Sequence, residues 1–478
     1  MGNRQARLWA AQAFWALTIS YLAIVSVAAT IAGALAGPGG GPLISPPLEI
    51  GGAITALAGA AFTGWRRSLG LGAASLVLTY RHPLALAMAC GGMSILVLWP
   101  FLRHSLPVLT LPLSDRFLHT HVVGPTGSGK SSSVLMPMLA HDLSNDHGVI
   151  LIEPKGDLSR AAYQQALASR RTVVFFDPDR PDCPRYNPLS GPGAVAAEGL
   201  AWALNQVSEA GHPFYAVTSR VQLIYAVLAV KDVLGADADL TSVVDFLRRE
   251  GFRRDILAQL HDERALAYFR DQVGQLSART AQEQRQGLLN RLELLLLNPS
   301  IRRAIVGPPD FDWDTVLQYG WVVIAPLSLA RLGESARILG TLLWHGLAMA
   351  VYRRPLHQHT PPAFLYLDEF HQYVTPDLSD FLALARGYRT GLVLAHQDLG
   401  QLSPTLSAAI LSNARQRILL GGLSAQDTEV FSRQAAPYLL PADLRTLRRG
   451  RAIVQTTRGG HLRRPTVVRL PYHSLEES

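Results

Sequence analysis

One stretch of the sequence combines glycines with a lysine and a hydroxyl residue at a spacing that suits phosphate binding. It is a full match to GxxxxGK[ST] and consists of Gly124, Pro125, Thr126, Gly127, Ser128, Gly129, Lys130 and Ser131. Glycines let the backbone wrap so that its N–H groups point at phosphate oxygens. We expect Lys130 to reach the β- and γ-phosphates and Ser131 to bind Mg²⁺. The match therefore predicts a nucleotide site with ATP and Mg²⁺ as cofactors.

Two acidic residues, Asp368 and Glu369, follow an apolar, strand-like run at 363–367. In a nucleotide site, Asp368 is expected to hold Mg²⁺ through water, and Glu369 to orient and deprotonate the attacking water. A strand that simply leaves a core can also end in two acids. The phosphate-binding motif upstream favours the catalytic interpretation, and an Asp-Glu pair favours an enzyme that hydrolyses ATP.

A further strand-like run at 391–395 ends in His396 and Gln397. A glutamine at such a strand end can contact the γ-phosphate and report its loss to a neighbouring subunit. Arg386 precedes this run and is the first candidate for the arginine that ring ATPases place against the nucleotide of the next subunit, with Arg389 as the second. A solvated arginine at a helix end is an equally good interpretation of either residue.

The elements that must position these residues alternate along the chain. A β-like run at 119–123 leads into the phosphate-binding motif. Other strand-like runs lie at 149–152, 172–176, 321–325, 363–367, 391–395, 417–421 and 451–456. Helical patterns separate several of them, and this alternation predicts an α/β fold with a parallel sheet covered by helices.

Strand signals disappear between about 236 and 305. Charged helical stretches such as 243–250 and 282–297 appear instead, with apolar positions three and four residues apart. This segment is predicted to be an all-α insertion between two parts of the α/β domain. Either it contacts a substrate or it is an ordinary helical insertion.

The N-terminal region, 1–104, is predicted to be membrane-embedded. Residues 10–36 and 83–102 are apolar runs long enough to span a bilayer, and a shorter apolar segment lies at 50–64. Arginines before the first run favour a cytoplasmic N-terminus. A cleaved signal peptide is the alternative for that run. Two crossings would return residue 105 to the cytoplasm, where ATP is found.

The charge balance favours an acidic partner. The net charge is +8, and the segment 445–469 holds eight Arg and no acidic residue. Its charge could face DNA phosphates or lipid headgroups, or it could be a solvated edge. Lysine occurs only at positions 130, 155 and 231. Lys155 could therefore order the nucleotide pocket or a subunit contact, because an arginine-biased chain keeps a compact ammonium there.

The cysteine content excludes two classes of stabilised fold. Cys90 and Cys183 are the only cysteines. A disulfide framework is not expected, and neither is a zinc site built from cysteine and histidine.

The motifs, taken in order, resemble those of the type IV secretion coupling proteins, within the FtsK–HerA class of motors. The matching segments are 123–131, 153–158, 187–189, 367–370, 386–397, 412–414 and 449–454. The resemblance extends from about residue 115 to 472. Glu153 departs from it, since the family usually has Asp at that position.

The resemblance implies a RecA-like P-loop nucleotide-binding domain in two parts, 105–235 and 306–478, with an inserted all-α domain at 236–305. It also implies a homo-hexameric ring around a channel, anchored in the bacterial inner (cytoplasmic) membrane with the ATPase in the cytoplasm. The implied partners are DNA (a relaxase-bound single strand), protein substrates or both, together with components of the secretion channel.

Two other functions remain open on the sequence. An FtsK/HerA-like DNA translocase outside secretion would use the same ATP site, although that class usually has more membrane spans. A nucleotide-switched receptor could dock substrates while another ATPase supplies the force.

Overall fold

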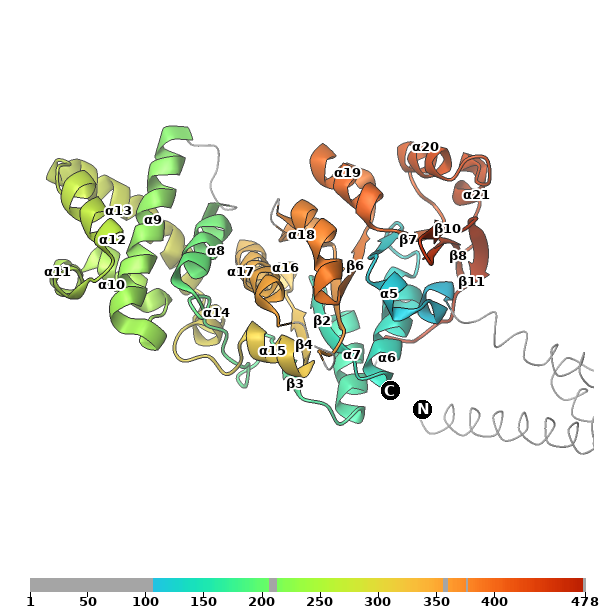
Figure 1. The fold of residues 1–478 in the computed structure, drawn as a ribbon, viewed down its shortest axis with the longest axis horizontal. Coiled ribbons are helices and arrows are strands. Elements are labelled where there is room, and N and C mark those ends of the chain that lie inside the picture. The colour runs from blue at the N-terminus through green and yellow to red at the C-terminus, as the bar shows by residue number, and fades with distance from the viewer. Residues whose placement is uncertain (1–105, 206–212, 356–359, 375–376, 476–478) are drawn as a thin grey trace, which may run out of the picture. The chain divides into compact units, whose positions relative to one another are not determined.

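The computed structural model describes residues 106–475, apart from 206–212, 356–359 and 375–376 (Figure 1). The apolar runs predicted as membrane spans, 10–36, 50–64 and 83–102, lie outside these residues. Within the described part of the chain, no helix has the length and apolar character needed to cross a bilayer.

A nine-stranded sheet forms the centre of the described part, in the order β11-β8-β7-β1-β6-β5-β2-β4-β3. Its strands are β1 (Thr120–Val123), β2 (Gly148–Glu153), β3 (Val173–Phe175), β4 (Val322–Pro326), β5 (Ala363–Asp368), β6 (Thr390–His396), β7 (Gln416–Leu420), β8 (Arg451–Gln455) and β11 (Thr466–Arg469). The strands from β7 to β3 run parallel, while β8 and β11 add antiparallel at one end. The predicted α/β fold with a large parallel sheet is confirmed.

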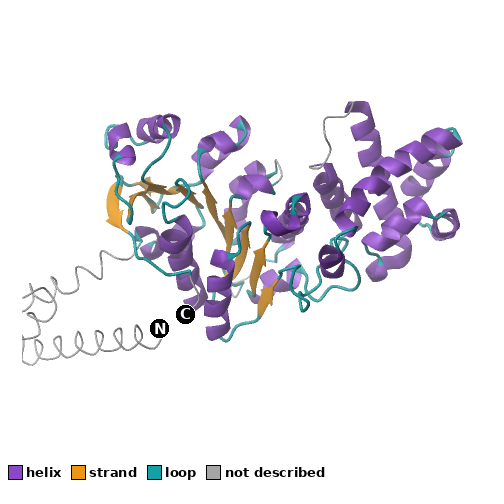
Figure 2. Cartoon of the chain, turned by 180° about the vertical axis from the view of Figure 1, so that it is seen from behind, coloured by secondary structure: helices purple, strands orange, loops and turns teal. Residues whose placement is uncertain are grey.

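Both faces of the parallel sheet are buried, which explains why its strands read as continuous apolar runs. On β2, Ile150 and Ile152 face one apolar cluster, and Val149 and Leu151 face another. Helices α17 (Glu334–Arg353) and α18 (Leu378–Leu384) cover the first face. Helices α6 (Met136–Ser144) and α7 (Asp157–Ala168) cover the second. Figure 2 shows the strands between these helical layers.

The described chain between β3 and β4 begins with a loop at 176–192 and then contains helices and no strand. It contains α8 (Gly193–Asn205), α9 (Pro213–Leu234), α10 (Leu240–Arg248), α11 (Glu250–Gln259), α12 (Glu263–Ala267), α13 (Ala278–Leu296), α14 (Pro299–Ile305) and α15 (Trp313–Tyr319). Asp239 begins α10 by accepting a hydrogen bond from Ser242 N, and Asn298 begins α14 in the same way. Helix α9 packs against α10, α11, α12 and α13, at one end of Figure 1. The helices that pack together thus begin before residue 236.

The remaining elements connect or flank the sheet. They are α5 (Leu113–Arg116), α16 (Leu329–Leu332), α19 (Pro404–Asn413), α20 (Ala425–Gln434), α21 (Pro441–Arg445) and a separate hairpin of β9 (Thr457–Arg458) and β10 (His461–Leu462). A buried polar network joins α5 to the sheet. In it, Arg116 donates to Asp142 of α6 at 2.9 Å, and the hydroxyl of Tyr366 on β5 donates to the same carboxylate.

Candidate nucleotide-binding site

The phosphate-binding motif forms the turn that follows β1 and precedes the π-helical turn Lys130–Leu135, which continues into α6. Gly127 and Gly129 adopt φ values of 77° and 96°, in the left-handed region that favours glycine. A Cβ on Gly124 would lie 2.7 Å from the Leu420 Cβ, so the loop passes too close to β7 for a side chain. The glycines of the motif are therefore required by the backbone path.

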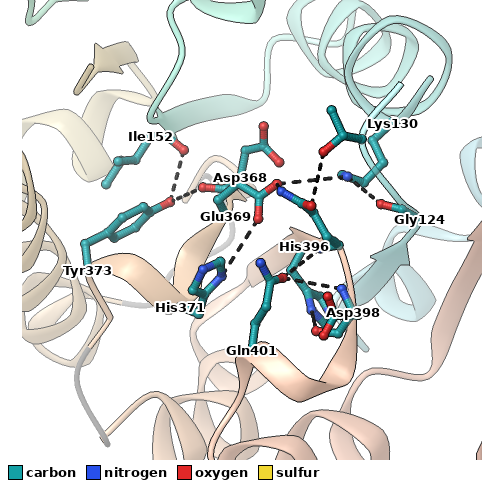
Figure 3. Close-up of polar contacts among 12 residues, drawn as sticks. Gly124, Lys130, Ile152, Asp368, Glu369, His371, Tyr373, His396, Asp398 and Gln401 are labelled. Carbon is teal, nitrogen blue, oxygen red and sulfur yellow. Dashed lines mark hydrogen bonds and ion pairs between the residues drawn. The ribbon is translucent and has the colours of Figure 1, made fainter. Parts of the chain in front are cut away.

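Lys130 points back across its own loop. Its Nζ donates to the Gly124 carbonyl oxygen at 2.5 Å and lies 4.0 Å from Glu369 Oε1 (Figure 3). Burial lowers the pKa of Lys130, while the charges of Glu369 and Asp368 act to raise it. This ammonium, 7% exposed, is thus held beside the loop by partners that phosphate oxygens can replace.

The acidic pair lies at the carboxyl end of β5, and both residues are 2% exposed. Burial raises the pKa of Asp368 to about 6, the charge of Glu369 adds to this rise, and Lys130 opposes it. Asp368 Oδ1 and Glu369 Oε2 have no hydrogen-bond partner among the described residues. Glu369 Oε2 also lies 3.8 Å from His371 Nδ1 (Figure 3). Two buried carboxylate oxygens without hydrogen-bond partners among the described residues form a site that suits a hydrated divalent cation.

Gln397 connects the two halves of this site. Its Nε2 donates to Glu369 Oε1 at 3.1 Å, and its Oε1 accepts from Thr126 Oγ1 of the phosphate-binding loop at 3.1 Å. The strand order explains the meeting, because β6 lies between β1 and β5 and all three run parallel. Their carboxyl ends therefore reach the same edge of the sheet.

The structure does not bring Arg386 to this site within one chain. Arg386 is exposed in the short 3-10 turn Ala385–Tyr388, before β6, whereas Gln397 follows β6. At about 3.3 Å per residue, the length of β6 separates the two by roughly 20 Å. Arg389 ends the same turn with a left-handed φ of 52°. Either arginine could reach a nucleotide only in a neighbouring subunit.

Two further residues support the site and were not predicted from the sequence. The Tyr373 hydroxyl lies 3.1 Å from both the Ile152 and Asp368 carbonyl oxygens, so it holds the ends of β2 and β5 together. Gln401 Oε1 accepts from the backbone N–H of Gln397 at 3.0 Å. The sequence signal for Gln401 is the capping-box spacing from Asp398. No local pattern identifies Tyr373.

Glu153 and Lys155 lie beside the acidic pair. Glu153 ends β2 and accepts from Ser159 N at 2.7 Å, which caps α7. Burial raises the pKa of Glu153 to about 7, and the nearby charge of Asp368 contributes to this rise. The charge of exposed Lys155 lowers the pKa of Asp368, so this segment belongs to the electrostatic surroundings of the site.

The fold and the site together define a P-loop nucleotide-binding protein with a RecA-like α/β sheet. A family model described as "Type IV secretory system Conjugative DNA transfer" matches residues 111–438. The chain belongs to this family of type IV secretion coupling proteins. No curated protein matches the chain by sequence.

Several solved structures share the fold. The plasmid coupling protein TrwB in complex with the GTP analogue GDPNP matches with a TM-score of 0.59 at 15% identity, covering 78% of this chain and 90% of that one. TrwB in complex with ADP and Mg²⁺ gives 0.56 at 16% identity, covering 76% and 86%. VirB4 of Thermoanaerobacter pseudethanolicus gives 0.51 at 14% identity, covering 77% and 92%. At these identities the likeness concerns the fold.

Proposed function

We propose that this family member is the inner-membrane coupling ATPase of a type IV secretion or conjugation system. It hydrolyses ATP to translocate relaxase-bound DNA, protein substrates or both. The observation that carries the proposal is the Gln397 side chain, which contacts the phosphate-binding loop and the candidate catalytic acid at once. A γ-phosphate sensor needs both contacts, whereas a site that only holds a nucleotide does not need Glu369.

The roles of the residues follow from their positions. Lys130 exchanges its contacts with Gly124 and Glu369 for the β- and γ-phosphates. Glu369 accepts the proton of the attacking water, and Gln397 fixes the direction of that carboxylate. Asp368 and Ser131 would hold Mg²⁺, which neutralises charge on the phosphates when bound. The unpartnered Asp368 oxygen and the left-handed glycines of the loop fit such a ligand.

A homo-hexameric ring completes the site in this proposal. Arg386 is exposed and lies at the opposite edge of the sheet from its own Glu369. As the finger, it would act on the nucleotide of the next subunit, where an arginine supplied in trans contributes about 10³- to 10⁵-fold in rate. This geometry favours Arg386 as a trans residue over any role in its own site.

The remaining regions have proposed roles as well. Residues 1–104 anchor the chain in the bacterial inner membrane, 105–235 and 306–478 form the nucleotide-binding domain, and the helices within 236–305 meet the substrate. All eight arginines of 445–469 are exposed. Their charge is available to an acidic partner, and DNA phosphates are the proposed contact.

Transfer in cells lacking the native copy tests this function. Complementation with Glu369→Gln should abolish transfer while the protein accumulates in the membrane at the wild-type level. Glu429→Gln, the same change at a 61% exposed glutamate on α20, is the matched control and should transfer normally. Wild-type transfer by Glu369→Gln would contradict a pump and favour a nucleotide-switched receptor.

A further inference from the structure

Two buried histidines lie behind Gln397 and have no part in the function proposed above. His121 belongs to β1, three residues before Gly124, and His396 ends β6. Both side chains are 0% exposed. Their ring planes are parallel to within 7°, and their Nε2 atoms lie 2.7 Å apart. One nitrogen must therefore donate a proton to a lone pair on the other.

The partners of the pair fix its tautomers. His396 Nδ1 lies 2.8 Å from the Asp398 carbonyl oxygen, which can only accept, so Nδ1 carries the hydrogen. In a neutral His396 ring, Nε2 then carries a lone pair and accepts the hydrogen bond that His121 Nε2–H donates. Among the described residues, His121 Nδ1 has no hydrogen-bond partner, which is consistent with a lone pair on that nitrogen. The Phe431 ring lies against the His121 ring. Burial lowers the pKa of His396 to about 4 and that of His121 well below its usual value.

The pair fastens the loop that carries Gln397. His396 is opposite Val123 in the last pairing of β1 with β6, so the loop beyond it has no strand partner on this side. The His396 N–H holds the Asp398 carbonyl, and Gln401 Oε1 accepts from the Gln397 N–H at 3.0 Å. The Gln401 contact comes from within the loop that carries Gln397. The His396 contact is anchored by His121, which lies on β1, the strand that leads into the phosphate-binding loop.

We infer that His121 and His396 are positioning residues for nucleotide hydrolysis. Their N–H···N bond keeps the Gln397 loop aligned with the phosphate-binding loop, so that the Gln397 amide stays directed at Glu369. This inference rests on the proposed hydrolytic function of the site. Burying two neutral imidazole rings away from water costs free energy, and apolar side chains could fill the same space without that cost. The N–H···N hydrogen bond between the rings offsets the cost.

Two substitutions at His121 distinguish the role of its hydrogen bond from the role of its ring in packing. His121→Phe keeps an aromatic ring of similar size but has no N–H to donate. His121→Gln loses the ring and keeps an amide N–H that can reach His396 Nε2. A packing role predicts that phenylalanine is the better replacement, whereas a positioning role predicts glutamine.

The experiment uses full-length protein in detergent and measures amide hydrogen exchange at 397–401 together with kcat and KM for ATP. We expect His121→Phe to raise exchange in this loop about 10-fold and to lower kcat by a similar factor at unchanged KM, because small misplacements of catalytic groups are costly. His121→Gln should stay within about 3-fold of wild type in both readouts.

A matched control is His119→Gln. His119 is also buried and directly precedes β1, but its ring contacts Leu382 O and Leu392 N, away from Gln397. We expect a lower melting temperature and unchanged amide exchange at 397–401. Wild-type exchange and kcat in His121→Phe, with His121→Gln impaired, would overturn the inference. A wild-type protein that does not hydrolyse ATP would instead refute the proposed function, and loop exchange would still decide the role of the pair.

Discussion

The edge of the sheet that carries the candidate site and the helical segment α10–α14 differ in how far their charged side chains are buried. At the sheet edge, Lys130, Asp368 and Glu369 are each less than 10% exposed. In the helical segment, ion pairs lie on the surface. Arg279 and Glu283 of α13 form one at 2.9 Å, with side chains 88% and 63% exposed.

This difference indicates which region of the chain contains its catalytic residues. Burying a charge costs free energy unless a partner or ligand compensates it, so buried charge persists where it has a use. Surface pairs are solvated whether or not they form. Substitutions at the sheet edge should therefore change catalysis or folding strongly, whereas those on the helical surface should be tolerated.

The largest expected effect is on catalysis at the sheet edge. Glu369→Gln removes the proton acceptor and should lower kcat by roughly 10²- to 10⁴-fold. Binding of a fluorescent ATP analogue should persist, because Lys130 and the phosphate-binding loop are unchanged. Lys130→Ala should lose binding itself. Steady-state hydrolysis and titration of the analogue distinguish the two variants, and equal hydrolysis by Glu369→Gln and wild type would end the catalytic assignment.

A buried ion pair away from the candidate nucleotide site tests whether burial alone makes the stability of the protein sensitive to substitution of a charged residue. Arg116→Leu leaves the Asp142 carboxylate, 0% exposed, with Tyr366 and His147 as its remaining partners. We expect a loss of about 3–5 kcal/mol in unfolding free energy. Urea denaturation followed by circular dichroism measures it. A change below about 1 kcal/mol, typical of an exposed pair, would show that this pair is not strongly coupled to folding.

Burial of Glu153 at the sheet edge predicts that the stability of the protein depends on pH. Its pKa rises from 4.5 to about 7 on folding, so the folded state holds a proton that the unfolded state releases between these values. Stability should therefore fall as pH increases through this window, by about 3 kcal/mol in total. Glu153→Gln cannot titrate and can still accept from Ser159 N. Its melting temperature should exceed that of wild type at pH 8 and approach it at pH 4. Parallel melting curves across this range would contradict the raised pKa.

The smallest effect is expected on the helical surface. Arg279→Ala removes an exposed i,i+4 pair and should change unfolding free energy by no more than about 0.5 kcal/mol. ATP hydrolysis should be unchanged. If this variant destabilised the protein as much as Arg116→Leu, the contrast between the two regions would fail.

The sequence predicted the elements that depend on local pattern. The phosphate-binding motif, the Asp368-Glu369 pair and the strands of the parallel sheet each have a short-range signature, and the structure contains these strands. Contacts between distant segments have no such signature. Tyr373 and the pairing of His121 with His396 bring together residues up to 275 positions apart, and a lone histidine in an apolar strand reads as an ordinary core residue.

Arg386 illustrates a different limit. The sequence predicts that it acts on the nucleotide of the next subunit, and no local pattern shows where it lies in the sheet. It precedes β6 and so lies at the amino edge of the sheet. In a parallel sheet, only residues that follow the strands reach the carboxyl edge. Topology thus assigns Arg386 to another surface, and only a neighbouring subunit could use it at a nucleotide.

The most direct test of the central claim is the ATPase activity of the full-length protein in detergent, measured against protein concentration with and without single-stranded DNA. A DNA-stimulated ring motor with its finger supplied in trans predicts that activity per chain rises with assembly and rises further with DNA. Activity per chain that is independent of both concentration and DNA would contradict such a motor.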